Sequence, residues 1–172
     1  SFVSSLKDAL ESAGLDARRL VLEVTESVVL SSEAIVEKVL GDLLATGAQL
    51  ALDDFGTGYS SLTSLQRYKF SKVKIDRSFV SGLPSDPANM AIVRAVIGIG
   101  QDLGIDVVAE GVEKEAQANA LLLEGCSSMQ GYLFGRPVSF SDTVANLAVA
   151  ALRVGDAPNP DMNNASLSMM GR

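Results

Sequence analysis

Polar side chains recur where short apolar runs of the sequence end. They are four carboxylates and one lysine, Glu23, Asp53, Asp54, Lys74 and Glu110, and an amide, Gln130, is predicted to open the last strand. Carboxylates that converge on one cavity repel each other unless cations bridge them. Oxygen ligands in a chain that contains no histidine suit Mg²⁺ or Mn²⁺. Two such ions can activate a water and stabilise the leaving oxygen of a phosphodiester, so the residues predict metal-dependent phosphodiester chemistry.

Short β-prone runs alternate with amphipathic helical segments, which is typical of a parallel sheet covered by helices. The predicted strands are Leu20–Glu26, Gln49–Asp54, Lys72–Asp76, Asp106–Glu110 and Met129–Phe134. The predicted helices span about 2–13, 31–45, 87–103, 114–124 and 141–152. The polar residues then lie at the carboxyl edge of the sheet, where α/β active sites form. Five strands fit either a doubly wound sheet or part of an eight-stranded barrel.

Structural roles are the alternative for each acid taken alone. An isolated acid at a strand end is more often a helix cap or a salt-bridge partner. Asp53 and Asp54 are harder to explain in that way, because adjacent side chains of a regular strand point to opposite faces. One of the two carboxylates would then be buried, which is costly without a partner. A structural salt bridge with Lys74 remains the alternative for this pair.

Composition excludes several classes of function. The chain has 172 residues, enough for one domain, and a net charge of −7, which argues against duplex nucleic acid as a ligand. No apolar run approaches the roughly 20 residues of a membrane span. The single cysteine, Cys126, indicates a buried apolar residue in a reducing, cytoplasmic compartment. From Gly155 onward the composition predicts a flexible tail over 155–172, which leaves a domain over 1–154.

Five strings of the sequence, in this order, resemble the EAL-domain phosphodiesterases of bacterial cyclic di-GMP signalling. They are Glu-Val-Thr-Glu-Ser (23–27), Asp-Asp-Phe-Gly-Thr-Gly-Tyr-Ser-Ser-Leu (53–62), Lys-Ile-Asp-Arg-Ser-Phe-Val (74–80), Ala-Glu-Gly-Val-Glu (109–113) and Gln-Gly-Tyr-Leu-Phe-Gly-Arg-Pro (130–137). The resemblance implies an α/β fold, a TIM-type (β/α) barrel present here as a partial barrel with about five parallel strands.

The resemblance also implies a role for each matching residue. Glu23, Asp53 and Asp54 would hold two Mg²⁺ or Mn²⁺ ions. Lys74 and Glu110 would hold or activate the attacking water, with Gln130 in the same network. Loop-supporting roles fall to Glu26, Asp76 and Glu113. Substrate-binding roles fall to Phe55, Gly56, Arg136 and Pro137.

The implied reaction is hydrolysis of cyclic di-GMP to linear pGpG, inhibited by Ca²⁺. The implied partners are a second copy of the chain, in a homodimer, and a sensory or GGDEF domain that can tether the cytoplasmic domain to a membrane protein. The family's EAL tripeptide and a metal-binding asparagine would precede Ser1, so we expect little turnover from these 172 residues alone. The alternatives are a catalytically inactive EAL domain that serves as a cyclic di-GMP receptor or interaction module, and a barrel swapped between two chains.

Overall fold

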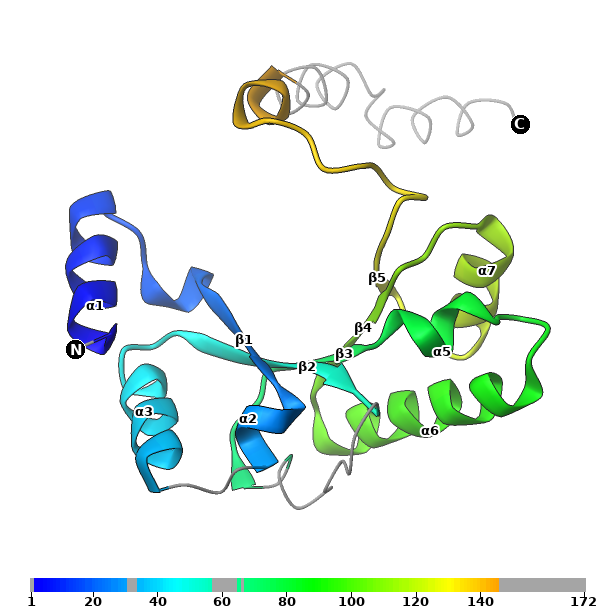
Figure 1. Cartoon of the computed structure of the whole chain (residues 1–172), viewed down its shortest axis with the longest axis horizontal. Helices are drawn as coiled ribbons and strands as arrows, with labels where there is room; N and C mark the ends of the chain where they lie inside the picture. The colour runs from blue at the N-terminus through cyan, green and yellow to red at the C-terminus, as the bar shows by residue number, and fades with distance from the viewer. Residues whose placement is uncertain (1, 31–33, 57–64, 66, 146–172) are drawn as a thin grey trace, which may run out of the picture. The chain divides into compact units, whose positions relative to one another are not determined.

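The structure, a computed structural model, describes residues 2–30, 34–56, 65 and 67–145 (Figure 1). The chain divides into two compact units, Ser1–Gly135 and Arg136–Arg172. The second unit is described only over 136–145, where residues 140–145 are helical. The rest of the predicted helix over 141–152, the predicted domain end at 154 and the predicted tail lie outside the described residues.

The first unit contains a parallel sheet in which the strands follow one another in sequence order. Its strands are β1 (Val21–Thr25), β2 (Gln49–Phe55), β3 (Lys72–Ile75), β4 (Asp106–Glu110) and β5 (Ser128–Gln130), paired in the order β1-β2-β3-β4-β5. Every pairing is parallel, which confirms the predicted α/β fold. The middle strand of the sheet is therefore β3.

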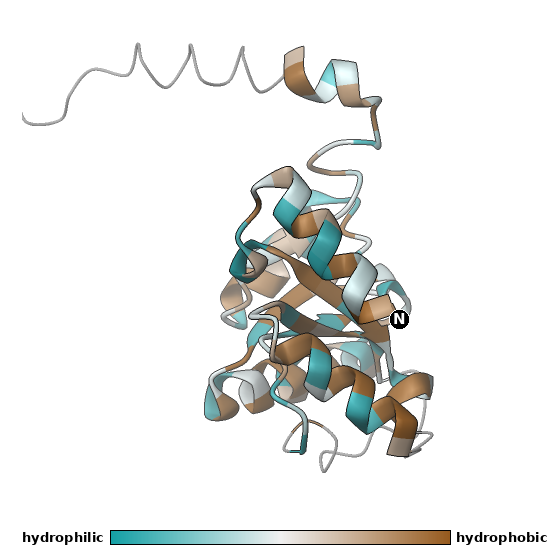
Figure 2. Cartoon of the chain, turned by 90° about the vertical axis from the view of Figure 1, so that its left-hand side faces the viewer, coloured by the Kyte–Doolittle hydropathy of each residue, from teal (hydrophilic) through white to brown (hydrophobic). Residues whose placement is uncertain are grey.

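Helices precede and connect the strands. They are α1 (Phe2–Ala13), the 3₁₀ turn η1 (Ala17–Arg19), α2 (Glu26–Leu30), α3 (Ala34–Leu44), α5 (Arg77–Ser81), α6 (Pro87–Leu103) and α7 (Glu115–Leu123). Figure 1 shows α3 and α6 on the same side of the sheet, and α6 contacts both β3 and β4. In Figure 2 the strands are mostly apolar, whereas the helices that cover them carry both apolar and polar stripes.

Local signals explain the bounds of α6. The Asp86 side chain accepts hydrogen bonds from Ala88 N and Asn89 N, at 2.9 and 3.2 Å, and Pro87 occupies the first turn. The helix ends at Gly104, whose φ of 67° is left-handed and therefore favours glycine. The structure confirms the predicted helix over about 87–103.

The fifth strand was predicted too long. It ends at Gln130, and residues 131–134 turn back, with Leu133 N donating to Val112 O at 3.0 Å. Gly131 explains the turn, because a Cβ at this position would lie 2.1 Å from the carbonyl oxygen of Val112. The backbones at 112 and 131 are in direct contact, so Gln130 closes the strand instead of opening it.

Side chains along each strand point alternately to the two faces of the sheet, so the apolar core and the polar site residues lie on opposite faces. Leu50 and Leu52 of β2, Val73 and Ile75 of β3 and Ala109 of β4 belong to the buried apolar core. The intervening residues point to the opposite face of the sheet, since the side-chain period of a strand is two. That opposite face carries Glu23, Asp53, Lys74 and Glu110.

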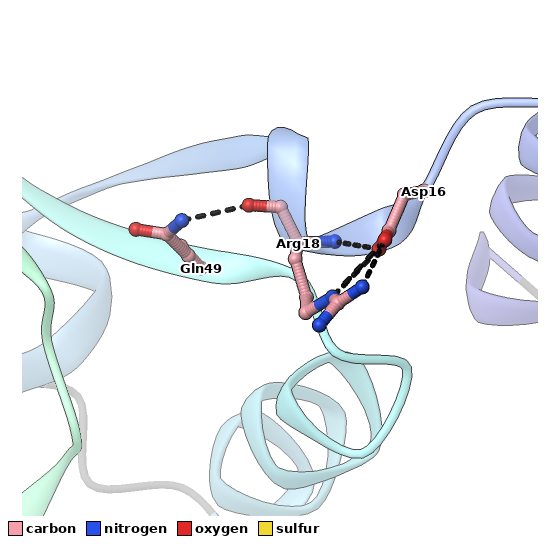
Figure 3. A network of polar contacts seen from close by, with 3 residues as sticks. All are labelled: Asp16, Arg18 and Gln49. Atoms are coloured by element: carbon pink, nitrogen blue, oxygen red, sulfur yellow. Dashed lines mark hydrogen bonds and ion pairs between the residues drawn. The ribbon is translucent and has the colours of Figure 1, made fainter.

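A polar network fixes the start of β1 against the start of β2. Asp16 accepts from the backbone N of Arg18 at 2.9 Å and pairs with the Arg18 guanidinium, as Figure 3 shows. Gln49 Nε2 then donates to the Arg18 carbonyl oxygen at 2.7 Å. The register continues from this point, with Glu23 beside Ala51 and Thr25 beside Asp53. The network thus positions the acidic ends of both strands.

Two glycines of α6 allow a direct test of helix–sheet packing. A Cβ on Gly100 would lie 2.2 Å from Val107 Cγ2, whereas a Cβ on Gly98 would meet nothing within 4 Å. We expect Gly100→Ala to lower the free energy of unfolding by about 1–3 kcal/mol, because the helix must move away from β4. We expect Gly98→Ala to be neutral or to stabilise by up to about 1 kcal/mol. Urea denaturation measures both, and equal effects would contradict the proposed close approach.

Candidate functional site

Lys74 of β3 links three carboxylates from three other strands of the sheet, β1, β2 and β4. Its Nζ lies 2.7 Å from Glu110 Oε1, 2.8 Å from Glu23 Oε2 and 3.1 Å from Asp53 Oδ1. The lysine side chain is only 9% exposed, whereas that of Glu23 is 52% exposed. The predicted cluster at the carboxyl edge therefore exists, and Lys74 is its centre.

The environment of Lys74 keeps its ammonium group protonated. Burial acts to lower the pKa of Lys74, but hydrogen bonds to Glu110, Glu23 and Asp53 outweigh burial and raise the pKa above its ordinary value. A lysine in this state donates hydrogen bonds at neutral pH and cannot accept a proton. Lys74 can therefore orient or neutralise an anionic group, but it cannot serve as a general base.

Asp54 departs from the geometry of a regular strand. Its φ of 55° is left-handed, and the pairing of β2 with β3 shifts between Leu52 and Phe55, which marks a bulge. The bulge overturns the prediction that Asp53 and Asp54 point to opposite faces. One carboxylate oxygen from each of Asp53, Asp54 and Glu110 lies within 4.8 Å of the others.

These carboxylates form a donor set that fits a divalent cation. The half-buried residues Asp53, Asp54 and Glu110 each offer one oxygen atom, and these atoms are close enough to bind the same ion. Glu23 lies near them, because it pairs with Lys74 as Asp53 and Glu110 do. The donors are hard oxygen atoms, without imidazole or thiolate, and such sets favour Mg²⁺ or Mn²⁺. Glu110 was predicted to act on the water, whereas its position also allows it to serve as a ligand.

A pocket of about 340 Å³ opens beside this cluster. Its walls are the ends of β2, β3, β4 and β5 with the residues that follow them: Asp54, Asp76, Arg77, Glu110, Gly111, Glu113, Gln130, Gly131 and Tyr132. Glu110 and Gln130 are directly paired across β4 and β5. The structure thus brings together four of the six predicted residues, Asp53, Asp54, Glu110 and Gln130, as pocket lining or candidate metal ligands. The other two are linked to them by ion pairs, because Lys74 contacts Asp53 and Glu110 and also holds Glu23.

The predicted loop-supporting residues take different positions. Glu26, the predicted last residue of the first strand, is instead buried at the start of α2, one residue beyond the observed end of β1. Asp76 lies beyond β3, where its Oδ1 accepts from Ser78 N at 2.9 Å and caps α5. Burial acts to raise the pKa of Asp76, but the hydrogen bonds to Ser78 outweigh it and lower the pKa. Glu113 is exposed, and its backbone N donates to Gln117 Oε1 at 2.8 Å.

The predicted substrate-binding residues are more dispersed. Phe55 is 5% exposed, packs in the apolar core and is not among the residues that line the described pocket. Gly56 has a φ of 97°, and a Cβ there would lie 3.0 Å from the Phe79 ring. Arg136 and Pro137 are exposed residues of the second unit. The remainder of the glycine-rich string, 57–62, lies outside the described residues.

Sequence reasoning assigned no role to Arg77, Gly111, Gly131 or Tyr132, which all line the pocket. Each directly follows a residue of the predicted constellation or lies within two positions of one. That adjacency was an available signal, because the segments that follow parallel strands form the walls of sites at this edge. Cys126, by contrast, is 2% exposed, as the predicted buried role requires.

The ion pairs that Lys74 forms with three carboxylates lead to a prediction for stability. We expect Lys74→Met to lower the free energy of unfolding by about 2 kcal/mol or more in chelator, because three carboxylates lose their shared cation. Lys72→Met is the matched control: Lys72 pairs with Asp106 at 2.8 Å, but this pair is more exposed, so the loss should stay below about 1 kcal/mol.

Urea denaturation at pH 7 measures both variants. The raised pKa of Lys74 means that its contribution is complete at this pH and is lost only as the pH rises through the folded-state pKa. Equal losses for the two variants would show that the Lys74 cluster does not stabilise the fold.

Comparison with known proteins identifies the family. The model of the EAL domain matches residues 1–137. The bifunctional diguanylate cyclase/cyclic di-GMP phosphodiesterase MucR of Pseudomonas aeruginosa is 43% identical over 146 residues, 85% of this chain and 21% of its own length. The chain thus spans about a fifth of this curated relative.

Solved structures of EAL proteins resemble this chain in fold as well as in sequence. The MucR phosphodiesterase in complex with cyclic di-GMP has a TM-score of 0.77 at 43% identity, over 82% of this chain and 57% of that one. The EAL domain of DcpA from Mycobacterium smegmatis has a TM-score of 0.79 at 42% identity, over 86% and 66% of the two chains. BlrP1 of Klebsiella pneumoniae, solved with manganese and cyclic di-GMP, has a TM-score of 0.75 at 41% identity, over 78% and 34%. The chain therefore belongs to the EAL domain family, and its sheet is part of a TIM-type (β/α) barrel.

Proposed function

We propose that this EAL domain hydrolyses one phosphodiester bond of cyclic di-GMP to give linear pGpG, with Mg²⁺ or Mn²⁺. The observation that carries the proposal is the convergence of Asp53, Asp54 and Glu110, with ligand atoms within 4.8 Å of one another, beside the buried Lys74. Membership of a family that includes a cyclic di-GMP phosphodiesterase and its complex with that dinucleotide supports the choice of substrate.

The metal ligands proposed are Glu23, Asp53 and Asp54, with Glu110 able to join them. Two bound cations would supply Lewis-acid stabilisation of the phosphodiester and activation of the attacking water. The left-handed backbone at Asp54 turns its carboxylate toward Asp53 and Glu110, so the ligands converge before any cation binds. Such preorganisation lowers the cost of assembling the site.

Three residues are proposed to act on the attacking water, each in a different way: Lys74, Glu110 and Gln130. Lys74 stays protonated; when cations take over carboxylates that it contacts, its released N–H groups would orient the water and its charge would offset charge that develops on the phosphate. Glu110, the carboxylate next to Lys74 Nζ, is the group that accepts a proton from the water. Gln130 lies beside Glu110 and can hold the water or the substrate with its amide. The water oxygen bonds to phosphorus and the bond from phosphorus to the 3′ oxygen breaks. That oxygen takes up the proton that the water gave to Glu110 and leaves as a hydroxyl.

Supporting roles for Glu26, Asp76 and Glu113 complete the proposal. Asp76 ties the end of β3 to α5, and Glu26 sits buried at the end of β1. Gly56, Arg136 and Pro137 are proposed to contact the nucleotide. In the full-length protein we propose a homodimer and an attached sensory or GGDEF domain, since the relative MucR is named as a bifunctional cyclase and phosphodiesterase. Among the described residues no helix has the length and apolar composition of a membrane span.

A catalytically inactive receptor or interaction module is the second candidate. It would bind cyclic di-GMP without hydrolysing it. The retention of Glu23, Asp53, Asp54, Lys74, Glu110 and Gln130 favours the enzyme, because a receptor needs no converging metal ligands beside a lysine.

Substitution of a proposed ligand tests the enzyme. We expect Asp53→Asn in the full-length protein to lower the rate of pGpG formation by more than about 10-fold, because the loss of one anionic ligand weakens cation binding. The matched control is Asp102→Asn on the exposed surface of α6, which should keep the wild-type rate. A loss of less than tenfold for Asp53→Asn would count against the metal mechanism.

Metal exchange provides an independent test. We expect full activity with Mg²⁺ or Mn²⁺, no activity in chelator, and inhibition by Ca²⁺, whose larger radius and looser geometry position the reacting groups less strictly. Chromatographic separation of pGpG from cyclic di-GMP measures each condition. Binding of cyclic di-GMP without turnover under every metal condition would favour the receptor.

A further inference from the structure

The charged residues that line the pocket beside the candidate metal ligands are acidic, with one exception. Its lining includes four carboxylates, Asp54, Asp76, Glu110 and Glu113, and a single cationic side chain, Arg77. The ammonium group of Lys74 is already engaged by three carboxylates, whereas no hydrogen bond from the Arg77 guanidinium to a described residue is formed. Arg77 is thus the cation of the described pocket wall that remains available to a ligand.

The backbone holds Arg77 firmly at this wall. Asp76 caps α5 immediately before Arg77, and Phe79 N donates to Asp76 O at 3.1 Å. Gly111, which follows Glu110, has a φ of 69°, and a Cβ there would lie 2.4 Å from Arg77 Cβ. The segment after β4 therefore packs directly on Arg77. The backbone of Arg77 is held in place, whereas its guanidinium forms no hydrogen bond to a described residue. Such a side chain is suited to ligand recognition.

We propose that Arg77 binds the guanine base of the dinucleotide, and so determines base specificity; this inference rests on the proposed function. Guanine presents two adjacent acceptors, O6 and N7, which match the two-pronged guanidinium of arginine. Its N1–H and N2–H₂ groups are donors, and the exposed carboxylate of Glu113 in the same pocket can accept from them. The ring of Tyr132, 53% exposed, offers a surface on which the base can stack.

The charges of the pocket favour a base over the second phosphate of the substrate at Arg77. A phosphate near Arg77 would also approach the carboxylates of Asp76 and Glu113, and like charges repel. The edge of guanine carries acceptors and donors side by side, so it can satisfy a guanidinium and a carboxylate together. A mixed pair of this kind discriminates between bases, whereas an isolated positive charge does not.

The test compares cyclic di-GMP with its 7-deazaguanine analogue, which lacks the N7 acceptor, in the full-length protein. We expect the wild type to prefer cyclic di-GMP in kcat/KM by about 10-fold, the effect of one lost partner of a bidentate contact. We expect Arg77→Gln to lower kcat/KM for cyclic di-GMP by about 10- to 100-fold, chiefly through KM, and to treat the two substrates alike. Arg77→Lys should recover only part of the preference, because lysine is a point charge without the planar fork.

Arg19→Gln is the matched control, since Arg19 is an exposed arginine of η1 that does not line the pocket. It should keep the wild-type rate and preference. If Arg77→Gln lowers both rates equally and keeps the preference, or if Arg77→Lys restores the wild-type preference in full, Arg77 acts as a charge and base recognition is wrong. An unchanged rate would also overturn the inference.

Equilibrium binding of both dinucleotides, measured by calorimetry, separates the two proposals. Binding that depends on N7 and Arg77 but produces no pGpG would keep the inference and overturn the proposed enzymatic function. Turnover that ignores N7 would keep the function and overturn the inference. Absence of binding to either dinucleotide would overturn both.

Discussion

The buried ammonium of Lys74 is the interaction on which the rest of the site depends. A buried ammonium is unfavourable unless several acceptors replace its water. Here the acceptors come from β2 and β4, the two neighbours of β3, and from β1, which lies beyond β2. A one-residue slip of any of these strands would move its carboxylate to the helix-covered face. The charge of one lysine therefore constrains the register of four strands, and the register in turn brings the metal ligands together.

Close backbone contacts position what surrounds this cluster. Gly131 lies against Val112, Gly111 against Arg77, and Gly56 against Phe79. Each glycine belongs to a segment that directly follows a strand of the sheet. A Cβ would overlap its neighbour at Gly111 and Gly131, and would make a tight contact at Gly56. The pocket walls are consequently supported by the ends of β2, β4 and β5 and by α5, which is a more rigid arrangement than long independent loops would provide.

Local sequence signals predicted most of the elements. The cap at Asp86, the stop at Gly104 and the strand over Asp106–Glu110 are encoded within a few residues, and the structure confirms them. The end of β5 was not predictable in this way, because Tyr132, Leu133 and Phe134 are β-prone residues. A contact between Gly131 and a segment about twenty residues earlier ends the strand.

The candidate site was predictable by residue type but not by geometry. The acids, the lysine and the amide were found because polar residues at the ends of apolar strands are unusual. The bulge at Asp54 escaped prediction, since it arises from a shift in pairing between β2 and β3 that no local signal encodes. Arg77 was overlooked for a related reason: its position in the pocket follows from packing against Gly111.

Asp54 also limits how this domain can diverge. It is the one non-glycine residue with a positive φ in the described part of the chain, and aspartate and asparagine are among the few side chains that tolerate this conformation. Asparagine would therefore preserve the backbone while removing the charge of a candidate ligand. A single substitution that the fold accepts would thus weaken cation binding and leave the dinucleotide pocket in place. The proposed enzyme and the alternative receptor could therefore differ by one residue.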